Sequence, residues 1–498
     1  MKNPIALHPR VQQFLSEPRK MLINGEWVES ASGNFFETIN PATGETLTTV
    51  AEADREDVDK AVKAAREAFE HGPWRRMKPM ERSKLLNKLS RLIEEHAEAL
   101  AQLEVLDNGM THKFAKRLIL NASERFYQYA GWATKIEGRT KQLASSSRMF
   151  AFTKREPLGV CGQITPWNIP LSAAALKIAA PLASGNTVVL KPAEQTPLTA
   201  LYLGELIQEA GIPPGVVNIV PGFGPTAGAA LAVHPDVDKL SFTGSTEVGK
   251  MIMKSGANTV KYVSLELGGK SPNIIFADAD IEKAVRGAIS GYIANSGQVC
   301  IAGSRLFVEK KVYDQVAAAL IEGSRRIRLG HGLDPNAQIG PLVSEEQLNT
   351  VLRCIQSGID EGAELLLGGK RAEEEPLKRG FFVKPTIFGN VADDMTIAKE
   401  EIFGPVICVM PFEDMDEVIE RANATDYGLV AGVWTTDMGK VHRMIDELQA
   451  GTVWVNTYGN LSNSMPFGGY KQSGIGREND RDAIDLYTQE KSVWINWE

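Results

Sequence analysis

The chain has 498 residues, of which 43% are hydrophobic and 23% charged, with a formal net charge of -8 and a pI near 5.6. This length exceeds what one hydrophobic core serves, so we expect two or three soluble globular domains. The acidic balance, with no block rich in Lys and Arg, argues against a nucleic-acid partner, because neutralising phosphates requires an excess of basic side chains.

The start of the chain, MKNPIALHPRVQQF, has no apolar run of signal-peptide length, and the apolar stretch 171–184 is broken by Lys177 and Pro181. We therefore expect no secretory signal and no membrane-spanning segment. The four cysteines stand far apart with no CxxC pair, which favours reduced thiols in a cytoplasmic protein over a disulfide framework. No metal site is expected.

The first segment opens with a short strand-like stretch, MLINGEWVES, followed by two helical patterns. Residues 55–71 and 81–109 keep apolar side chains at spacings of three and four and stop near a glycine, as helices do. From about residue 158, short runs rich in Val, Ile and Leu alternate with helical patterns that also stop at glycine. About five repeats of strand and helix predict a doubly wound parallel sheet.

A second series of strands and helices begins at about residue 271 and predicts another mixed α/β domain. Two stretches, 148–157 and 491–497, fit neither sheet, because they alternate apolar and polar side chains in isolation. Isolated strands need partners, so we expect an arm that joins subunits into an oligomer. The alternative is a small antiparallel flap on the same subunit.

A nucleotide-binding parallel sheet needs a phosphate-binding loop at its carboxyl edge, yet the chain has no GxGxxG fingerprint. GFGPTAG at 222–228 is one residue too long. In FTGSTEVGK, at 242–250, Gly244 and Ser245 follow a strand and lead into a helix whose amides can meet a pyrophosphate. The alternative is an ordinary turn with serine as the N-cap.

Lys191 stands at the end of another predicted strand, and Glu194 follows shortly after it. A lysine and a carboxylate in this place can grip the two hydroxyls of an adenosine ribose, and the carboxylate would repel a 2′-phosphate. The alternative is a surface ion pair on a loop rich in proline.

Cys300, in SGQVCIAGSR, is a candidate nucleophile although no histidine lies near it in the sequence. A thiol attacks as its thiolate, which requires proton removal or electrostatic help. Glu266 ends a strand within an apolar run, where burial raises the pKa of a carboxylic acid toward the range of a general base. Asn168 follows another strand and can donate its amide, with the backbone N–H of Cys300, to a developing oxyanion. Each residue alone is more simply explained by a structural role.

Seven stretches together resemble the NAD(P)-dependent aldehyde dehydrogenase superfamily in their order and spacing. The similarity runs from about residue 23 to the C-terminus, and this many long motifs in register are far more specific than any one of them. The stretches are TPWNIP, VVLKPAEQTP, FTGSTEVG, LELGGKSPNIIFADAD, SGQVCIAGSR, KEEIFGPVICVMPF and PFGGYKQSGIGRE.

The resemblance implies an α/β fold with a Rossmann-like parallel-sheet cofactor domain of five strands, a second α/β catalytic domain and a β oligomerisation arm. It places the NAD-binding domain at 1–138 and 158–267, the catalytic domain at 268–474 and the arm at 139–157 and 475–498. It also implies a homo-oligomer, either a dimer or a tetramer.

The same resemblance implies that Cys300 is the nucleophile, Glu266 the general base and Asn168 the oxyanion donor. Among the implied NAD ligands, Lys191 and Glu194 hold the adenosine ribose. Because of its charge, Glu194 favours NAD, and we expect NADP to be accepted weakly. The other implied cofactor-binding residues are Ile164, Thr165, Pro166, Trp167, Gly224, Phe242, Gly244, Ser245, Leu267, Glu401 and Phe403.

The implied reaction oxidises an aldehyde to a carboxylic acid through a thiohemiacetal and a thioester on Cys300. Coenzyme A-acylating relatives typically lack the equivalent of Glu266, so its presence favours hydrolysis. Substrate-tunnel positions that are often aromatic in enzymes for small aldehydes are mostly smaller here, which favours bulky aliphatic, aromatic or retinal-like aldehydes. These positions are Ile169, Ala173, Leu176, Ala294, Leu461 and Phe467.

Four alternatives remain at this point. The segment VQQFLSEPRKMLINGEWVES is similar to bacterial phenylacetaldehyde dehydrogenases. A semialdehyde dehydrogenase would need an Arg or Lys in the tunnel, and none can be placed. An esterase could use the same thiol, and a family member without turnover would serve as a binding or structural protein. No aromatic box for a quaternary ammonium is evident, which argues against betaine aldehyde.

Overall fold

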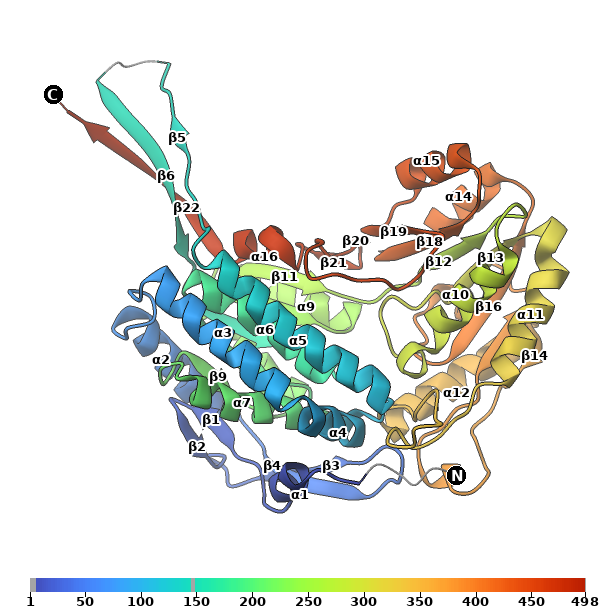
Figure 1. Cartoon of the computed structure of the whole chain (residues 1–498), viewed down its shortest axis with the longest axis horizontal. Coiled ribbons are helices and arrows are strands. Elements are labelled where there is room, and N and C mark those ends of the chain that lie inside the picture. Colours follow the sequence, from blue (N-terminus) through green and yellow to red (C-terminus); the bar gives the residue numbers. More distant parts are fainter. Residues whose placement is uncertain (1–5, 145–147, 498) are drawn as a thin grey trace.

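The computed structural model describes residues 6–144 and 148–497. Two large mixed sheets, each covered by helices, form the body of the molecule, and a narrow ribbon of strands projects from one end (Figure 1). Within the described residues, no helix is long and apolar enough to cross a membrane.

The first sheet has eight strands in the order β2-β1-β9-β8-β7-β10-β11-β21. Its five central strands are parallel, as expected, and antiparallel strands close both edges. The bounds are β1 Met21–Ile23, β2 Glu26–Val28, β7 Val160–Ile164, β8 Thr187–Lys191, β9 Val217–Ile219, β10 Lys239–Thr243, β11 Tyr262–Glu266 and β21 Gly474–Ile475.

Helices cover both faces of the first sheet, which is why its central strands read as continuous apolar runs rather than alternating ones. The two faces belong to two separate clusters of buried side chains. One face is covered by α3 Pro79–Glu95, α4 Ala97–Asn108, α5 His112–Trp132, α6 Pro170–Ser184 and α7 Leu198–Ala210, the other by α2 Arg55–Glu70, α8 Ala229–Val233 and α9 Thr246–Ala257.

The pattern at 81–109, which reads as one long helix, forms two. The helix is interrupted at His96, whose backbone angles (φ -95°, ψ 9°) lie outside the helical range. The reason lies in the packing, because α3 buries one stripe of side chains whereas every residue of α4 except Glu98 is buried. Periodicity continues across the break and hides it.

The second sheet has seven strands in the order β14-β15-β16-β13-β12-β18-β19, all parallel except β14. Helices cover both of its faces as well. The strands are β12 Pro272–Ile275, β13 Arg305–Glu309, β14 Glu364–Leu367, β15 Thr386–Gly389, β16 Val406–Phe412, β18 Val430–Trp434 and β19 Thr452–Val455, and the helices are α10 Ile281–Ile293, α11 Tyr313–Arg325, α12 Glu345–Asp360, α13 Thr396–Lys399, α14 Met415–Asn423 and α15 Met438–Glu447.

The projecting ribbon is formed by β6 (Met149–Pro157) and β22 (Thr488–Asn496), which pair antiparallel along their whole length, with β5 (Thr140–Lys141) beside β6. The two isolated stretches of the sequence are therefore partners of one another within one chain. Large apolar side chains stay exposed on the ribbon, for example Trp494 at 60%. Its use as an oligomerisation arm and the expected domain borders remain predictions.

The smaller elements connect these parts. They are α1 Pro9–Leu15, β3 Phe35–Ile39, β4 Thr46–Ala51, β17 Tyr427–Gly428, β20 Tyr470–Lys471, α16 Asp480–Leu486 and the short turns η1 Gly224–Gly228, η2 Ala294–Gly297, η3 Lys310–Val312 and η4 Leu377–Arg379.

Candidate active site

Most of the expected site residues lie where strands of the first sheet end. Strands β7, β8, β10 and β11 are parallel, so their carboxyl ends share one edge of the sheet. The loops that leave this edge carry Asn168, Glu194, Ser245 and Leu267, and Glu266 is the last residue of β11. Cys300 and Glu401 come to this edge from the second sheet.

The loop that carries Cys300 begins with an unusual backbone. Asn295 and Ser296 have φ values of 46° and 57°, and Gly297 continues the left-handed run at 77°. A side chain at Gly297 is impossible, since its Cβ would lie 2.0 Å from the carbonyl oxygen of Gly404. Gln298 holds the turn, because both its backbone N–H and its side-chain amide donate to the Asn295 carbonyl at 3.0 Å. Such strain persists only where the surroundings fix it.

Cys300 itself is partly accessible. Burial raises the pKa of its thiol, and the negative charges of Glu401 and Glu266 raise it further, while backbone N–H groups act in the opposite direction. The loop that follows Glu266 packs closely against Cys300, because a Cβ on Gly269 would lie 2.6 Å from the carbonyl oxygen of Cys300.

Glu266 is 5% exposed, and neither of its carboxylate oxygens has a hydrogen-bond partner in the part of the chain that the structure describes. Burial raises the pKa of this carboxyl group well above its ordinary value, and the negative charge of Glu478 raises it further. Lys177 and Arg477 lower it. A buried carboxyl group without a partner is costly, and such groups are typical of functional sites.

Lys177 and Glu478 form a buried ion pair behind Glu266. The Lys177 ammonium also donates to the hydroxyl of Ser241 at 2.9 Å, and the Ser264 hydroxyl donates to the same oxygen at 3.0 Å. In the sequence Lys177 stands out only as a break in an apolar helix. A lysine inside an apolar run was the only signal in the sequence for this ion pair, and neither Lys177 nor Glu478 was predicted as a site residue.

Asn168 is joined to the Cys300 loop by reciprocal hydrogen bonds. Its side-chain amide donates to the Gln298 carbonyl at 2.9 Å, and its own carbonyl accepts from the Asn295 side chain at 2.8 Å. A carboxamide carries two N–H hydrogens, so one remains for another acceptor. The structure thus brings Asn168, Cys300 and Glu266 to one region, as the hypothesis of an oxyanion site requires.

The predicted ribose ligands form an ion pair, with 2.9 Å between the Lys191 Nζ and the Glu194 Oε2. The Lys191 side chain is 3% exposed and that of Glu194 is 25% exposed, so the pair is not the surface pair that the sequence left open. Burial lowers the pKa of Lys191, and the charge of Glu194 opposes this effect. One oxygen of Glu194 remains available to a ligand.

The two glycine-rich candidates differ in structure. Ser245 caps α9, accepting from the Val248 N–H at 3.3 Å, and is exposed to solvent. Ser245 is thus the N-cap of α9, and the use of this turn in binding a pyrophosphate remains a prediction. Gly224 begins η1, and a Cβ at this position would have no atom within 4 Å, so free space adjoins it.

Glu401 is held against the loop that follows β11. The Gly269 N–H donates to its carboxylate at 3.1 Å, and a Cβ on Gly268 would lie 2.1 Å from it. Burial raises the pKa of Glu401 to about 7. Next to it, the rings of Phe403, a residue with φ 54°, and Trp167 lie nearly perpendicular, with 5.2 Å between their centroids.

The other expected cofactor residues support this edge of the sheet. Thr165 donates its N–H to the Lys191 carbonyl at 3.2 Å and so ties the two loops together. The turn at Gly244 packs directly on the Phe242 ring, because a Cβ on Gly244 would lie 2.4 Å from that ring. Ile164, Phe242 and Leu267 are buried, and Pro166 is partly exposed.

The predicted tunnel residues come from three segments. Ile169, Ala173 and Leu176 continue from the Asn168 loop into α6, and Ala294 precedes the strained turn. Phe467 pairs with Glu478 through backbone hydrogen bonds of 2.7 Å. Leu461 is 55% exposed on the loop that follows β19. Their common lining of a tunnel remains a prediction.

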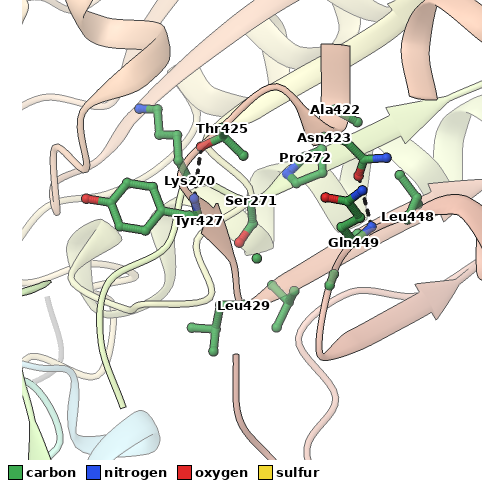
Figure 2. A pocket seen from close by; sticks show the side chains of 14 residues that line it. Lys270, Ser271, Pro272, Ala422, Asn423, Thr425, Tyr427, Leu429, Leu448 and Gln449 are labelled. Atoms are coloured by element: carbon green, nitrogen blue, oxygen red, sulfur yellow. Dashed lines mark hydrogen bonds between the residues drawn. The ribbon is translucent and has the colours of Figure 1, made fainter. Parts of the chain in front are cut away.

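A small pocket lies beside the loop after β11 (Figure 2). It carries none of the predicted site residues. Lys270, in its wall, is buried, and its ammonium has no hydrogen-bond partner among the residues described. Within 6–144 and 148–497 there is also no cluster of three or more His, Cys, Asp or Glu side chains able to hold a metal ion.

Comparison with known proteins shows the family to which the chain belongs. The sequence profile of the Aldehyde dehydrogenase family matches residues 27–493. The chain is 55% identical to the putative aldehyde dehydrogenase DhaS of Bacillus subtilis, over 98% of both chains. It is 52% identical to human retinal dehydrogenase 2, over 96% of this chain and 91% of that protein.

Among solved structures, the NAD+ complex of an aldehyde dehydrogenase from Bacillus cereus is 54% identical, covers 100% of both chains and has a TM-score of 0.97. Sequence and fold are therefore similar over the full length of the described chain. The chain belongs to the aldehyde dehydrogenase family.

Proposed function

We propose that the protein oxidises an aldehyde to a carboxylic acid with NAD+, using Cys300 as nucleophile, Asn168 as oxyanion donor and Glu266 as general base. The observation that carries this proposal is the meeting of three loops from two sheets. Asn168 bonds the carbonyl of Gln298, two residues before the cysteine, and the backbone after Glu266 contacts the carbonyl of Cys300.

The residues at the sheet edge fit NAD. The free oxygen of Glu194 and the ammonium of Lys191 suit the two hydroxyls of a ribose, and the open N-terminus of α9 at Ser245 suits a pyrophosphate. The carboxylate of Glu194 repels a 2′-phosphate, so NADP is the weaker cofactor. When bound, NAD+ supplies a hydride acceptor and a positive charge that favours the thiolate.

In the first half-reaction, the thiolate of Cys300 forms a C–S bond with the carbonyl carbon of the aldehyde. The carbonyl oxygen becomes an oxyanion, which accepts hydrogen bonds from the second N–H of the Asn168 side chain and from the backbone N–H of Cys300. The tetrahedral alkoxide-like carbon is a far better hydride donor than the free aldehyde. Loss of hydride leaves a thioester on Cys300.

In the second half-reaction, Glu266 removes a proton from water, and the resulting hydroxide attacks the thioester carbon. The C–S bond then breaks, releasing the carboxylic acid and the Cys300 thiolate. Glu266 can act in this way because its oxygens have no competing donor among the described residues. Its raised pKa makes it a stronger base than a solvated glutamate.

For the substrate we propose bulky apolar aldehydes, aliphatic, aromatic or retinal-like. Support comes from the small side chains at Ala173 and Ala294 and from the similarity to human retinal dehydrogenase 2. The alternative is a phenylacetaldehyde-type or semialdehyde dehydrogenase.

The test of the substrate class is a steady-state panel of acetaldehyde, benzaldehyde, phenylacetaldehyde, retinal and succinic semialdehyde with NAD and with NADP. The proposal expects the bulky apolar aldehydes to have the higher kcat/KM with NAD. A panel in which acetaldehyde or the semialdehyde ranks first would reject it.

A further inference from the structure

The last turn of α4 carries three polar side chains, Glu104, Asp107 and Asn108, each at most 1% exposed. Polar groups buried this deeply need hydrogen-bond partners, or the fold pays their full desolvation cost. Each of the three has at least one partner, and these partners, apart from the N–H of Met110, belong to segments that carry the site. The Oδ1 of Asp107 has no partner among the described residues.

Asn108 contacts the loop of the proposed oxyanion donor. Its side-chain amide donates to the carbonyl of Trp167 at 2.9 Å, while its side-chain oxygen accepts from the N–H of Met110 at 3.2 Å. The hydroxyl of Thr196, from the loop that follows Lys191, donates to the same Trp167 carbonyl at 3.1 Å. This carbonyl belongs to the peptide that precedes Asn168, so donors from two directions hold that peptide.

Glu104 and Asp107 contact the starts of two helices. The Glu104 carboxylate accepts from the N–H of Leu171 in α6 at 3.4 Å, and the Asp107 carboxylate accepts from the N–H of Leu198 in α7 at 3.0 Å. These first-turn N–H groups have no partner within their own helices, and a carboxyl group at a helix N-terminus is favourable. Helix α6 begins directly after the Asn168 loop, and α7 begins after the ribose loop.

The residue after this turn reaches the other side of the site. Gly109 has φ 91°, and a Cβ there would lie 2.7 Å from the ring of Pro341. Its carbonyl packs against Gly340, whose own carbonyl accepts from the Ser296 hydroxyl in the cysteine loop at 2.8 Å. The end of α4 therefore lies between the loops that carry Asn168 and Cys300.

We propose that Asn108 is a positioning residue for Asn168 and acts through the peptide between Trp167 and Asn168. The inference rests on the proposed role of Asn168 as oxyanion donor. Because a peptide unit is planar, fixing the Trp167 carbonyl also fixes the N and Cα atoms of Asn168. The hydrogen bond from the Asn295 side chain to the Asn168 carbonyl holds the next peptide, so the two peptides together set the direction of the Asn168 side chain. An oxyanion donor works only when it is held in place before the reaction, and a displacement of about 1 Å costs about 100-fold in rate.

The test is Asn108→Asp. Aspartate keeps the shape and the acceptor for Met110 but, in its ionised form, cannot donate to Trp167, so kcat is measured at alkaline as well as at neutral pH. We expect kcat for aldehyde oxidation to fall at least about tenfold, whereas the KM for NAD and the rate of Cys300 alkylation by iodoacetamide change less than about twofold. A general loss of structure would change all three quantities.

A double-mutant cycle with Asn168→Ala shows whether Asn108 acts through Asn168. In that background Asn108→Asp should cause no further loss of kcat, and additive losses would overturn the inference. If Asn168→Ala alone leaves kcat unchanged, the proposed oxyanion role is wrong instead, so the two failures are distinguishable.

Thr196 provides a second route if Asn108→Asp does not fold. Thr196→Val removes the other donor to the Trp167 carbonyl without adding a charge, and Thr196→Ser keeps the hydroxyl. We expect a loss of kcat of about threefold to tenfold for the valine variant and near wild-type kcat for the serine variant. Equal kcat in the valine variant and the wild type would contradict the positioning role of this peptide.

Discussion

Replacement of Glu478 by glutamine removes one negative charge behind Glu266 and leaves the size of the side chain nearly unchanged. In the wild type, burial and the negative charge of Glu478 raise the pKa of Glu266, and Lys177 lowers it. In Glu478→Gln the negative charge is gone, while the ammonium of Lys177 stays near and still has an oxygen to donate to. Both consequences favour the ionised form of Glu266, so its pKa falls.

The magnitude follows from the burial of all three groups. A neighbouring charge shifts the pKa of a carboxyl group by about 1 to 3 units, and we expect the lower end because no hydrogen bond joins Glu478 to the carboxylate of Glu266 among the described residues. One unit corresponds to about 1.4 kcal/mol. Since Glu266 acts as a base only when ionised, the acidic limb of the rate profile should move about one unit toward lower pH.

The assay is the pH profile of thioester or ester hydrolysis under conditions in which deacylation limits turnover. The matched control is Lys177→Gln, which removes a charge that lowers the Glu266 pKa and should therefore move the acidic limb toward higher pH. An acidic limb that stays in place in both variants, or that moves in the same direction in both, would refute the assignment of Glu266 as the titrating base.

Three further predictions follow from the same site. Cys300→Ala should abolish aldehyde oxidation and ester hydrolysis together while NAD binding, followed by tryptophan fluorescence, is retained; ester hydrolysis that survives would place that activity at another site. Glu194→Gln should reduce the ratio of kcat/KM for NAD over NADP by about tenfold, and an unchanged ratio would contradict the repulsion argument. Burial raises the folded-state pKa of Glu266, so stability falls as pH rises from the unfolded toward the folded value. Glu266→Gln should remove this loss of stability and therefore raise Tm, measured by scanning fluorimetry, more at about pH 9 than at about pH 6. An equal or opposite change in Tm would show that ionisation of Glu266 does not destabilise the folded protein.

The edge of the first sheet could be predicted from sequence because it follows from local rules. Apolar runs that end at Ile164, Lys191 and Glu266 read as parallel strands, and parallel strands bring their carboxyl ends together. The approach of Cys300 and Glu401 could not be derived in this way, because it depends on how the second sheet packs against the first. Only resemblance to a family indicated it.

Buried polar residues were the main omission. Lys177 and Asn108 interrupt apolar helices. A polar residue in an apolar pattern does not show whether another element supplies a hydrogen-bond or ion-pair partner for it. The alternation in β6 and β22 predicts two strands but not which strands they pair with, hundreds of residues apart. Only the flap alternative and the resemblance, which places both stretches in one arm, indicated their pairing. The break at His96 was missed because the apolar period continues through it.

The central claim is that the aldehyde carbon becomes bound to Cys300 and is released by water that Glu266 activates. Intact-protein and peptide mass spectrometry of Glu266→Gln mixed with NAD and an aldehyde such as benzaldehyde tests it directly. The account predicts that an acyl group accumulates on the peptide that contains Cys300, with about one equivalent of NADH formed per subunit. Normal turnover with no adduct on Cys300, or an adduct on any other residue, would contradict it.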